Sequence, residues 1–237
     1  MFFFFKPFLL LGIYLIMSVT WSAGVVPQST LIIVEEKDGE GNIDIKNTDS
    51  YSSLLITKIE NIEEDLEDLL VVYPPVARID ANALQTVRFI LTSKEPIKTE
   101  RFKRVIFEGI PPKNEQIQKE VNVIYKQNLP IIIRPAGLAE NKTPWESLIW
   151  EIVDNKLIVS NPSPYIVRFS STLVNLQLSK INYNLPQYYI LPNQKLIMET
   201  NINPQKNISK VREIVEFYPA TLWGFAAKES YKAFISE

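Results

Sequence analysis

Residues 120–135 read EVNVIYKQNLPIIIRP, and the rest of the chain is organised around this stretch. Val121, Val123 and Tyr125 alternate with the residues between them, which is the period-two pattern of a strand with two distinct faces. Pro130 then interrupts a β-branched run. Because proline has no N–H to donate to a ladder, the stretch is predicted to be an edge strand, or to be bulged near its middle.

An apolar edge strand offers unpaired backbone groups on which another chain can add a strand. Globular proteins normally cover such an edge or blunt it with charge. The same pattern is compatible with an ordinary core strand that carries a proline-marked bend. Two interpretations of this stretch therefore remain, a strand lent to a partner and a strand of a closed sheet.

Short strand-forming segments recur on both sides of this stretch. Turns rich in Pro, Asn, Asp and Ser separate them, and no long amphipathic helix is evident. This spacing is typical of β-sandwiches of the immunoglobulin type. The sequence predicts strands at 30–34, 42–46, 54–59, 69–73, 84–91, 102–107 and 120–134, and then at 148–153, 156–160, 166–172, 187–191, 195–200 and 212–218.

A segment rich in proline and small or polar residues, PAGLAENKTP at 135–144, is predicted to link the two blocks of strands. Each block is about the size of one sandwich domain. The predicted fold class is therefore all-β, with two immunoglobulin-like domains at 24–138 and 139–237. The acidic run ENIEEDLED at 60–68 is predicted to be a solvated loop or a short helical turn.

The N-terminal residues 1–23 differ from the rest. Lys6 precedes an apolar run at 8–17, and small residues follow at Ser22 and Ala23, which is the pattern of a secretory signal peptide. A membrane anchor is the alternative, but the apolar run is much shorter than the ~20 residues that a span needs. We expect export, cleavage of this segment and no stable membrane insertion afterwards.

The composition excludes several classes of function. A hydrophobic content of 46% in 237 residues is typical of a globular protein, and a net charge of −2 does not favour a nucleic-acid partner. The chain has no cysteine and no histidine, so the usual general base and the commonest transition-metal ligand are missing. No glycine-rich nucleotide motif or GxSxG serine occurs. The sequence thus predicts a binding protein without catalytic residues, cofactor or metal.

Five groups of residues resemble one known family in order and spacing across nearly the whole mature chain. They are PP at 74–75 with RID at 78–80, QTVR at 85–88, GIPPK at 109–113, RPAGL at 134–138 and VSNPSPY at 159–165. On these residues the chain resembles the PapD-like periplasmic chaperones of pilus assembly. The short segment at 113–120 and the absence of cysteine resemble the short-loop members.

The resemblance implies a boomerang of two domains, of which the N-terminal one lends its last strand to a pilus or fimbrial subunit. The donor positions fall on Val121, Val123 and Tyr125 within the strand 120–134. Alternate side chains of such a strand fill pockets of the subunit while its backbone completes the sheet. The implied partners are pilus subunits and an outer-membrane usher, where another subunit's strand replaces the donor without a nucleotide.

The resemblance also assigns two charges, Glu100 and Arg134, to an ion pair in the inter-domain cleft that sets the angle between the domains. Two independent surface charges are the alternative interpretation, and an exposed pair contributes little to stability.

The resemblance fails at the site that holds the subunit's C-terminal carboxylate. The two basic residues expected there correspond to Leu31 and Pro130, neither of which binds a carboxylate through its side chain. The candidate replacements are Arg104, Lys103 and Lys126. Arg104 is favoured because it precedes a V-x-F triplet, as in non-classical branches of the family, and because an arginine fork suits a carboxylate. The alternative is that Arg104 only decorates its strand.

A subunit chaperone of the periplasm is the leading hypothesis. The alternative from another class is a two-domain immunoglobulin-like structural or adhesive surface protein. A secreted hydrolase is disfavoured by the missing histidine.

Overall fold

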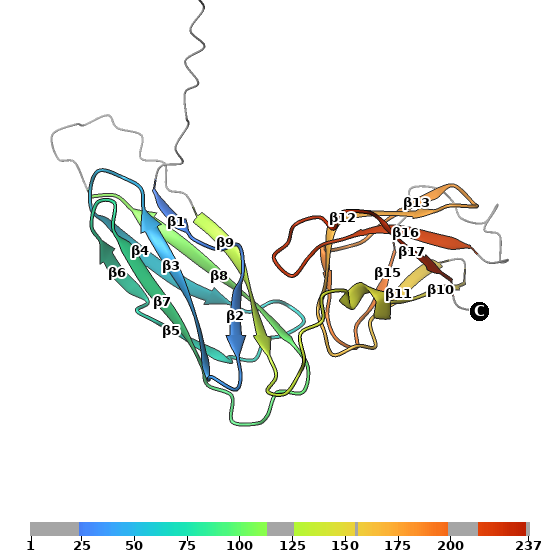
Figure 1. Ribbon diagram of the computed structural model, residues 1–237, viewed down its shortest axis with the longest axis horizontal. Helices are drawn as coiled ribbons and strands as arrows, with labels where there is room; N and C mark the ends of the chain where they lie inside the picture. Colours follow the sequence, from blue (N-terminus) through green and yellow to red (C-terminus); the bar gives the residue numbers. More distant parts are fainter. Residues whose placement is uncertain (1–23, 113–125, 155, 199–212, 236–237) are drawn as a thin grey trace, which may run out of the picture.

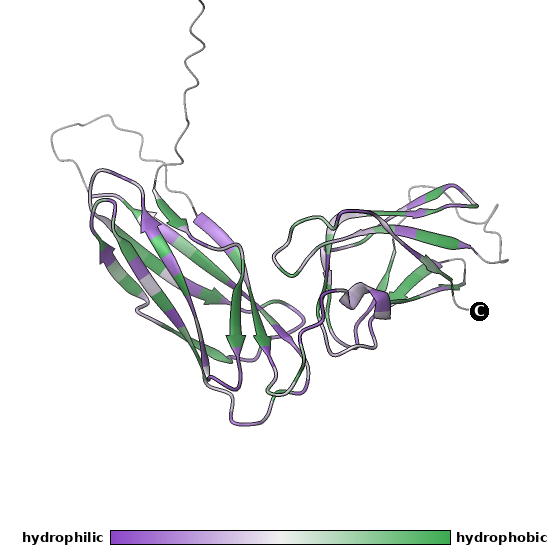
Figure 2. Cartoon of the chain, viewed as in Figure 1, coloured by the Kyte–Doolittle hydropathy of each residue, from purple (hydrophilic) through white to green (hydrophobic). Residues whose placement is uncertain are grey.

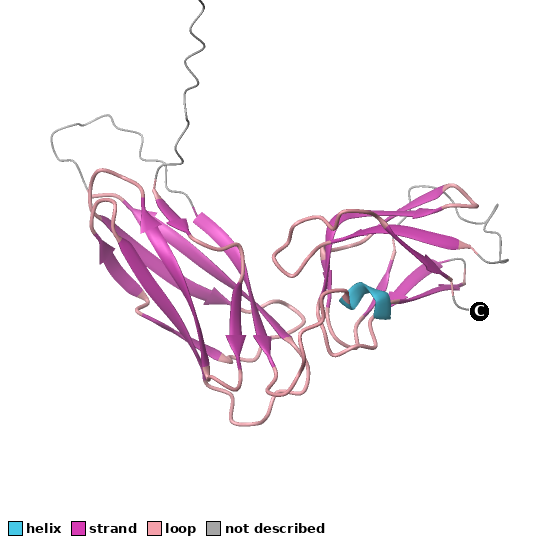
Figure 3. Ribbon diagram, viewed as in Figure 1, coloured by secondary structure: helices cyan, strands magenta, loops and turns pink. Residues whose placement is uncertain are grey.

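A computed structural model describes residues 24–112, 126–154, 156–198 and 213–235. Two β-sandwich domains meet at one corner with an open angle between them (Figure 1). Strands make up both domains, and the described residues contain one short 3-10 helix, η1 (Pro144–Ser147), just after the linker (Figure 3). The predicted all-β class with two sandwich domains is confirmed.

The described residues of the N-terminal domain form nine strands. Their order in the sheet is β5-β7-β3-β2-β9-β8-β4-β6, with β1 paired to β3. The strands are β1 (Val25–Pro27), β2 (Ile32–Glu35), β3 (Glu40–Asn47), β4 (Ser53–Glu60), β5 (Leu70–Tyr73), β6 (Val76–Ile79), β7 (Leu84–Leu91), β8 (Arg101–Ile110) and β9 (Lys126–Arg134).

Alternation along each strand builds the N-terminal core. In β7, Val87 and Phe89 are fully buried, whereas Arg88 between them is exposed. In β8, Val105 and Phe107 point into the same core. Each such side chain contributes about 1.5–3 kcal/mol on burial, so this row of contacts holds the two halves of the folded sheet face to face.

Strand β9 changes its environment at Pro130. Its last residues, from Ile131 to Arg134, pair with β2 in parallel, and Ile131 to Ile133 also pair with β8 in antiparallel orientation. Its first residues, Lys126 to Pro130, pair with β8 alone among the described strands, without a register shift. Figure 2 shows the same change in hydropathy, from polar to apolar along β9. The edge prediction is confirmed for 126–130 and wrong for 131–134, where β2 closes the sheet and the strand is interior; no bulge occurs.

In its described part, the C-terminal domain packs a three-stranded sheet on a five-stranded one. The first has the order β10-β11-β15 and the second β13-β12-β16-β17, with β14 also on β12. The strands are β10 (Ile149–Val153), β11 (Lys156–Ser160), β12 (Val167–Leu176), β13 (Ile181–Asn184), β14 (Tyr189–Ile190), β15 (Lys195–Ile197), β16 (Ile214–Pro219) and β17 (Tyr231–Phe234).

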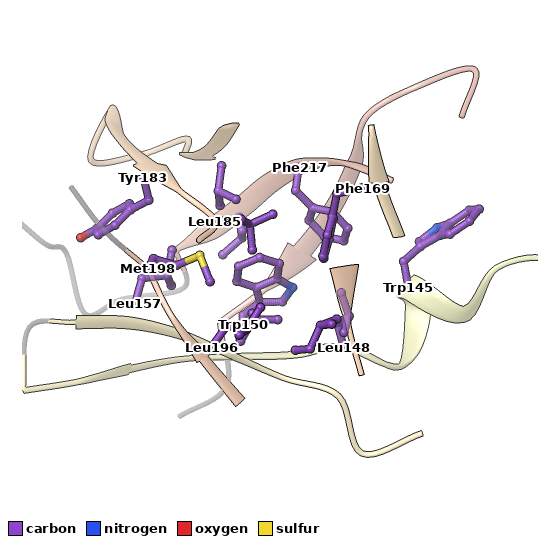
Figure 4. Close-up of a cluster of buried hydrophobic side chains, with 14 of the residues drawn as sticks. Trp145, Leu148, Trp150, Leu157, Phe169, Tyr183, Leu185, Leu196, Met198 and Phe217 are labelled. Carbon is purple, nitrogen blue, oxygen red and sulfur yellow. The ribbon is translucent and has the colours of Figure 1, made fainter. Parts of the chain in front are cut away.

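Aromatic side chains fill the space between these two sheets (Figure 4). Trp150 of β10 is fully buried, and its ring centroid lies 5.1 Å from that of Phe217 on β16. Phe169 of β12 contacts the Phe217 ring edge-on, with a centroid separation of 5.9 Å. Aromatic pairs of this kind supply a large buried apolar area in specific geometry, so the domain has its own core.

The acidic run at 60–68 departs from its prediction. Ile62 and Asp65 are buried and form an isolated β-bridge with each other. The Asp65 carboxylate accepts a hydrogen bond of 2.7 Å from Arg101 Nε and forms an ion pair of 2.9 Å with Lys103 Nζ. A solvated loop is therefore wrong at these two positions, because two cations of β8 draw the carboxylate inward.

Candidate functional site

The candidate site consists of the open edge of β9, residues 126–130, and the cleft where the two domains meet, which is lined by residues of both, among them Glu100, Arg134 and Arg168. At the open edge the backbone groups that face away from β8 have no ladder partner among the described strands. Gln127 donates from Nε2 to the Val25 carbonyl at 2.8 Å, which ties β9 to β1 through a side chain only. An extended segment can therefore add to β9 here.

The predicted donor residues Val121, Val123 and Tyr125 precede β9 and lie outside the described residues. Their role stays a prediction.

An apolar cluster joins the two domains. It consists of Leu31, Ile62, Phe102 and Ile132 from the N-terminal domain and Ile166 from the C-terminal domain. The cluster explains the loss of a basic residue at the first expected position, because Leu31 is only 3% exposed and packs between the domains. A charge there would be buried without a partner.

Glu100 connects the two domains through hydrogen bonds. Its Oε2 accepts from the Ile166 N–H at 2.8 Å, and its own N–H donates to the Pro164 carbonyl at 2.9 Å. Arg134 Nε lies 3.5 Å from Glu100 Oε1, and Arg134 Nη1 lies 2.8 Å from Glu35 Oε1. The structure thus brings Glu100 and Arg134 together, with Glu35 as the nearer carboxylate of Arg134. Control of the domain angle by this pair remains a proposal.

Burial raises the pKa of Glu100, although the Ile166 N–H and Arg134 act in the opposite direction. A carboxyl with a raised pKa in the folded state binds its proton more tightly there than in the unfolded chain. Its contribution to stability is therefore present below the unfolded pKa and is lost as pH rises through the folded pKa.

We therefore predict that acidification stabilises the wild type relative to Glu100→Gln. The difference in free energy of unfolding should grow as pH falls from above the raised pKa toward the ordinary glutamate value, because Gln cannot take up the proton. Urea unfolding at a series of pH values measures it, with Glu146→Gln, at an exposed position, as the matched control. A difference that shrinks on acidification would mean that the attraction to Arg134 exceeds the cost of burial.

Arg104 lies directly across the ladder from Pro130. Residues opposed in an antiparallel pair point to the same face, so Arg104 occupies the face of the second expected basic position. Its Nε donates to Asn128 Oδ1 at 2.7 Å and its Nη2 to the Asn128 carbonyl at 2.9 Å. Burial lowers the pKa of Arg104, while Tyr189 and Glu60 partly offset this.

The other two candidates have acidic partners within the chain. Lys103 faces the domain interior, is 1% exposed, and donates to the Asp65 carbonyl at 2.7 Å as well as to its carboxylate. Lys126 is largely exposed and pairs with Glu108 across the ladder at 3.1 Å. Both ammonium groups are neutralised by carboxylates of the chain, which leaves Arg104 as the remaining candidate.

Two residues of the cleft went unnoticed in the sequence, Tyr189 and Arg168. Tyr189 stacks on Phe102, with ring centroids 4.7 Å apart, and its hydroxyl donates to Glu64 at 3.4 Å. Burial, followed by the charge of Glu64, raises the pKa of Tyr189 to about 12. Arg168 donates from Nη1 to the Leu222 carbonyl at 2.7 Å. Its position three residues after the VSNPSPY motif was the available signal.

The described residues contain no group of three or more acidic, His or Cys side chains placed to bind a metal. Among the same residues, no helix has the length and apolarity to span a membrane.

Comparisons with known proteins agree with this architecture. Residues 24–139 match the model "Pili and flagellar-assembly chaperone, PapD N-terminal domain", and residues 143–215 match "Pili assembly chaperone PapD, C-terminal domain". The fimbrial chaperone YhcA of Escherichia coli, itself described as uncharacterized, is 37% identical over 207 residues, which are 87% of this chain and 88% of YhcA.

Solved structures show the same fold. In the complex of the Salmonella enterica SafA pilin with the SafB chaperone, the matched chain has a TM-score of 0.68 at 19% identity, with 91% of this chain and 98% of that one covered. The YadV chaperone gives 0.67 at 22% identity, with 88% and 99% covered. These relatives are chaperones, in agreement with the prediction that the chain is not an enzyme. The chain belongs to the PapD-like family of pilus-assembly chaperones of the chaperone–usher pathway.

Proposed function

We propose that this chaperone binds pilus or fimbrial subunits by donor-strand complementation, with 120–134 as the donor strand, and delivers them to an outer-membrane usher. Chaperones of this family are periplasmic, and residues 1–23 are proposed to be the signal peptide that is removed on export. The SafA–SafB complex supports a pilin as partner, because a chaperone of this fold holds a pilin there. The proposed domain limits remain 24–138 and 139–237.

The open edge of β9 is the observation that carries this proposal. In the sequence, residues 121–125 directly precede the edge residues 126–130 of β9, so that the strand-forming pattern continues from Val121 to Pro130. Positions 121, 123 and 125 have the same alternation as Leu129, Ile131 and Ile133, which contribute to the N-terminal core. In the proposed complex the donor side chains would continue that core into the groove of the subunit.

Co-expression with the subunit gene nearest to the chaperone gene tests this function. The subunit should appear in the soluble periplasmic fraction as a 1:1 complex with the chaperone, and it should aggregate when expressed alone. A structural or adhesive surface protein would leave the subunit insoluble in both cases and would itself be accessible at the cell surface.

Arg104 is proposed to hold the C-terminal carboxylate of the subunit in place of the residue lost at Pro130. A hydrogen bond to a charged group contributes about 1.5–3 kcal/mol. We predict that Arg104→Gln raises the dissociation constant of the complex roughly 10- to 100-fold. Arg78→Gln, which removes an exposed arginine of the same domain, is the control. Equal affinities of the two variants would show that Arg104 only decorates β8.

A further inference from the structure

Arg168 is brought to the cleft face of Arg104 by a series of neighbouring residues. Arg168 of β12 is the register partner of Tyr189 on β14, so their side chains point to the same face. The ring of Tyr189 stacks on Phe102 of β8 at 4.7 Å. Phe102 and Arg104 are two apart on β8 and therefore share its cleft face. One arginine from each domain thus borders Tyr189.

These two arginines differ from the others in their charge balance. Among the arginines that the structure describes, Arg78, Arg88, Arg101 and Arg134 each have a carboxylate within 4.0 Å, whereas Arg104 and Arg168 have none that belongs to a described residue. The nearby carboxylates have other contacts, since Glu60 pairs with Lys58 and Glu64 accepts from Tyr189. Glu100, which lines a pocket together with Arg168, pairs with Arg134 and accepts from the Ile166 N–H. Burial lowers the pKa of Arg168, and the positive charge of Arg104 lowers it further. Two partly buried like charges repel unless an anion lies between them.

We propose that Arg168 is the second basic residue of the carboxylate site, so that an arginine from each domain binds the C-terminal carboxylate of the subunit. The inference rests on the proposed function and adds to it a residue from the C-terminal domain.

The local structure holds Arg168 ready for this role. Its Nη1 bond to the Leu222 carbonyl fixes the guanidinium to the loop between β16 and β17, which reaches toward the N-terminal domain (Figure 1). The same loop is tied across the cleft, because Thr30 Oγ1 donates to the Trp223 carbonyl at 2.9 Å. A guanidinium oriented in this way keeps further N–H groups in a planar fork that matches a carboxylate.

A double-mutant cycle tests the proposal. The probe is a synthetic peptide that copies the last strand of the co-encoded subunit, prepared with a free C-terminal carboxylate and with a C-terminal amide. Binding of both forms to the full-length wild type, Arg168→Gln, Arg168→Lys and the control Arg78→Gln is measured by calorimetry. We expect Arg168→Gln to weaken binding of the carboxylate peptide roughly tenfold or more and to change binding of the amide by less than about twofold. Arg168→Lys, which keeps the charge without the fork, should restore part of the affinity for the carboxylate.

The outcomes separate this inference from the function on which it rests. If Arg168→Gln weakens both peptides equally, its role is to support the loop at Leu222, and the inference is wrong while the donor-strand function stands. If Arg168→Gln changes neither peptide, the inference is equally overturned. If the wild type binds neither peptide and forms no complex with the intact subunit, the proposed function fails and the inference with it. Thermal unfolding of each variant shows whether it is folded. If Arg168→Gln is not folded, Arg168→Lys is compared with the wild type instead.

Discussion

Val123→Glu should abolish the soluble complex between this chaperone and its subunit. In the proposed complex the Val123 side chain enters an apolar pocket of the subunit, and a carboxylate cannot be buried there without a partner. We expect the dissociation constant to rise at least about 100-fold. Size-exclusion chromatography of periplasmic extracts, together with calorimetry on the purified proteins, measures the loss.

A matched substitution on a distant strand controls for the added charge. Val71 on β5 is 53% exposed, and β5 is four strands removed from β9 in the order of the sheet. Val71→Glu should therefore leave the complex intact. A full yield of complex with Val123→Glu would exclude residues 120–125 as the donor segment.

Asp65→Ala should destabilise the N-terminal domain by about 3–5 kcal/mol, because it leaves the buried Lys103 ammonium without its counter-charge. The carboxylate holds both Arg101 and Lys103, and Lys103 is 1% exposed. Burial on its own would raise the pKa of Asp65, but hydrogen bonds from Arg101 and Lys103 outweigh it, and the pKa is lowered. The stabilisation is therefore present above the unfolded pKa and is lost as pH falls through the folded one.

Urea unfolding, monitored by far-ultraviolet circular dichroism, measures this loss of stability. Glu63→Ala is the control. Glu63 lies in the same acidic run and is exposed, so its removal should change the free energy of unfolding by less than about 0.5 kcal/mol. Equal effects of the two substitutions would show that the buried pairing with Lys103 adds nothing to stability.

The strands that bury one face were readable from the sequence. The prediction for 84–91 coincides with β7, in which exposed and buried side chains alternate. The prediction for 156–160 coincides with β11, in which three consecutive apolar residues lie between Lys156 and Ser160. The missed strands β1, β6, β13 and β17 have three or four residues each. A segment of three or four residues is too short for a period-two pattern to distinguish a strand from a turn. Whether such a segment forms a strand depends on its pairing with neighbouring strands in the folded domain.

The candidate site was predictable only in part. The opposition of Arg104 and Pro130 depends on the register of β8 against β9, which residue identities alone do not specify. Asp65 was misread because an acidic run is usually solvated, and only the fold shows the two cations that face it. Tyr189 and Arg168 belong to the other domain than Phe102 and Arg104, and no periodicity in the chain links the two pairs.

In the proposed complex, Pro130 would give the shared strand a fixed end point. Beyond it β2 already occupies the edge of β9, through the pairs Ile32 with Ile131 and Ile33 with Ile132. A subunit strand that adds along β9 must therefore stop at Pro130, beside Arg104. Because the added strand would stop at Pro130 and its carboxylate would bind next to that stop, the C-terminus of the subunit would fix the register of its last strand on β9. A subunit lengthened by a single residue would then present every side chain of its last strand to the wrong face.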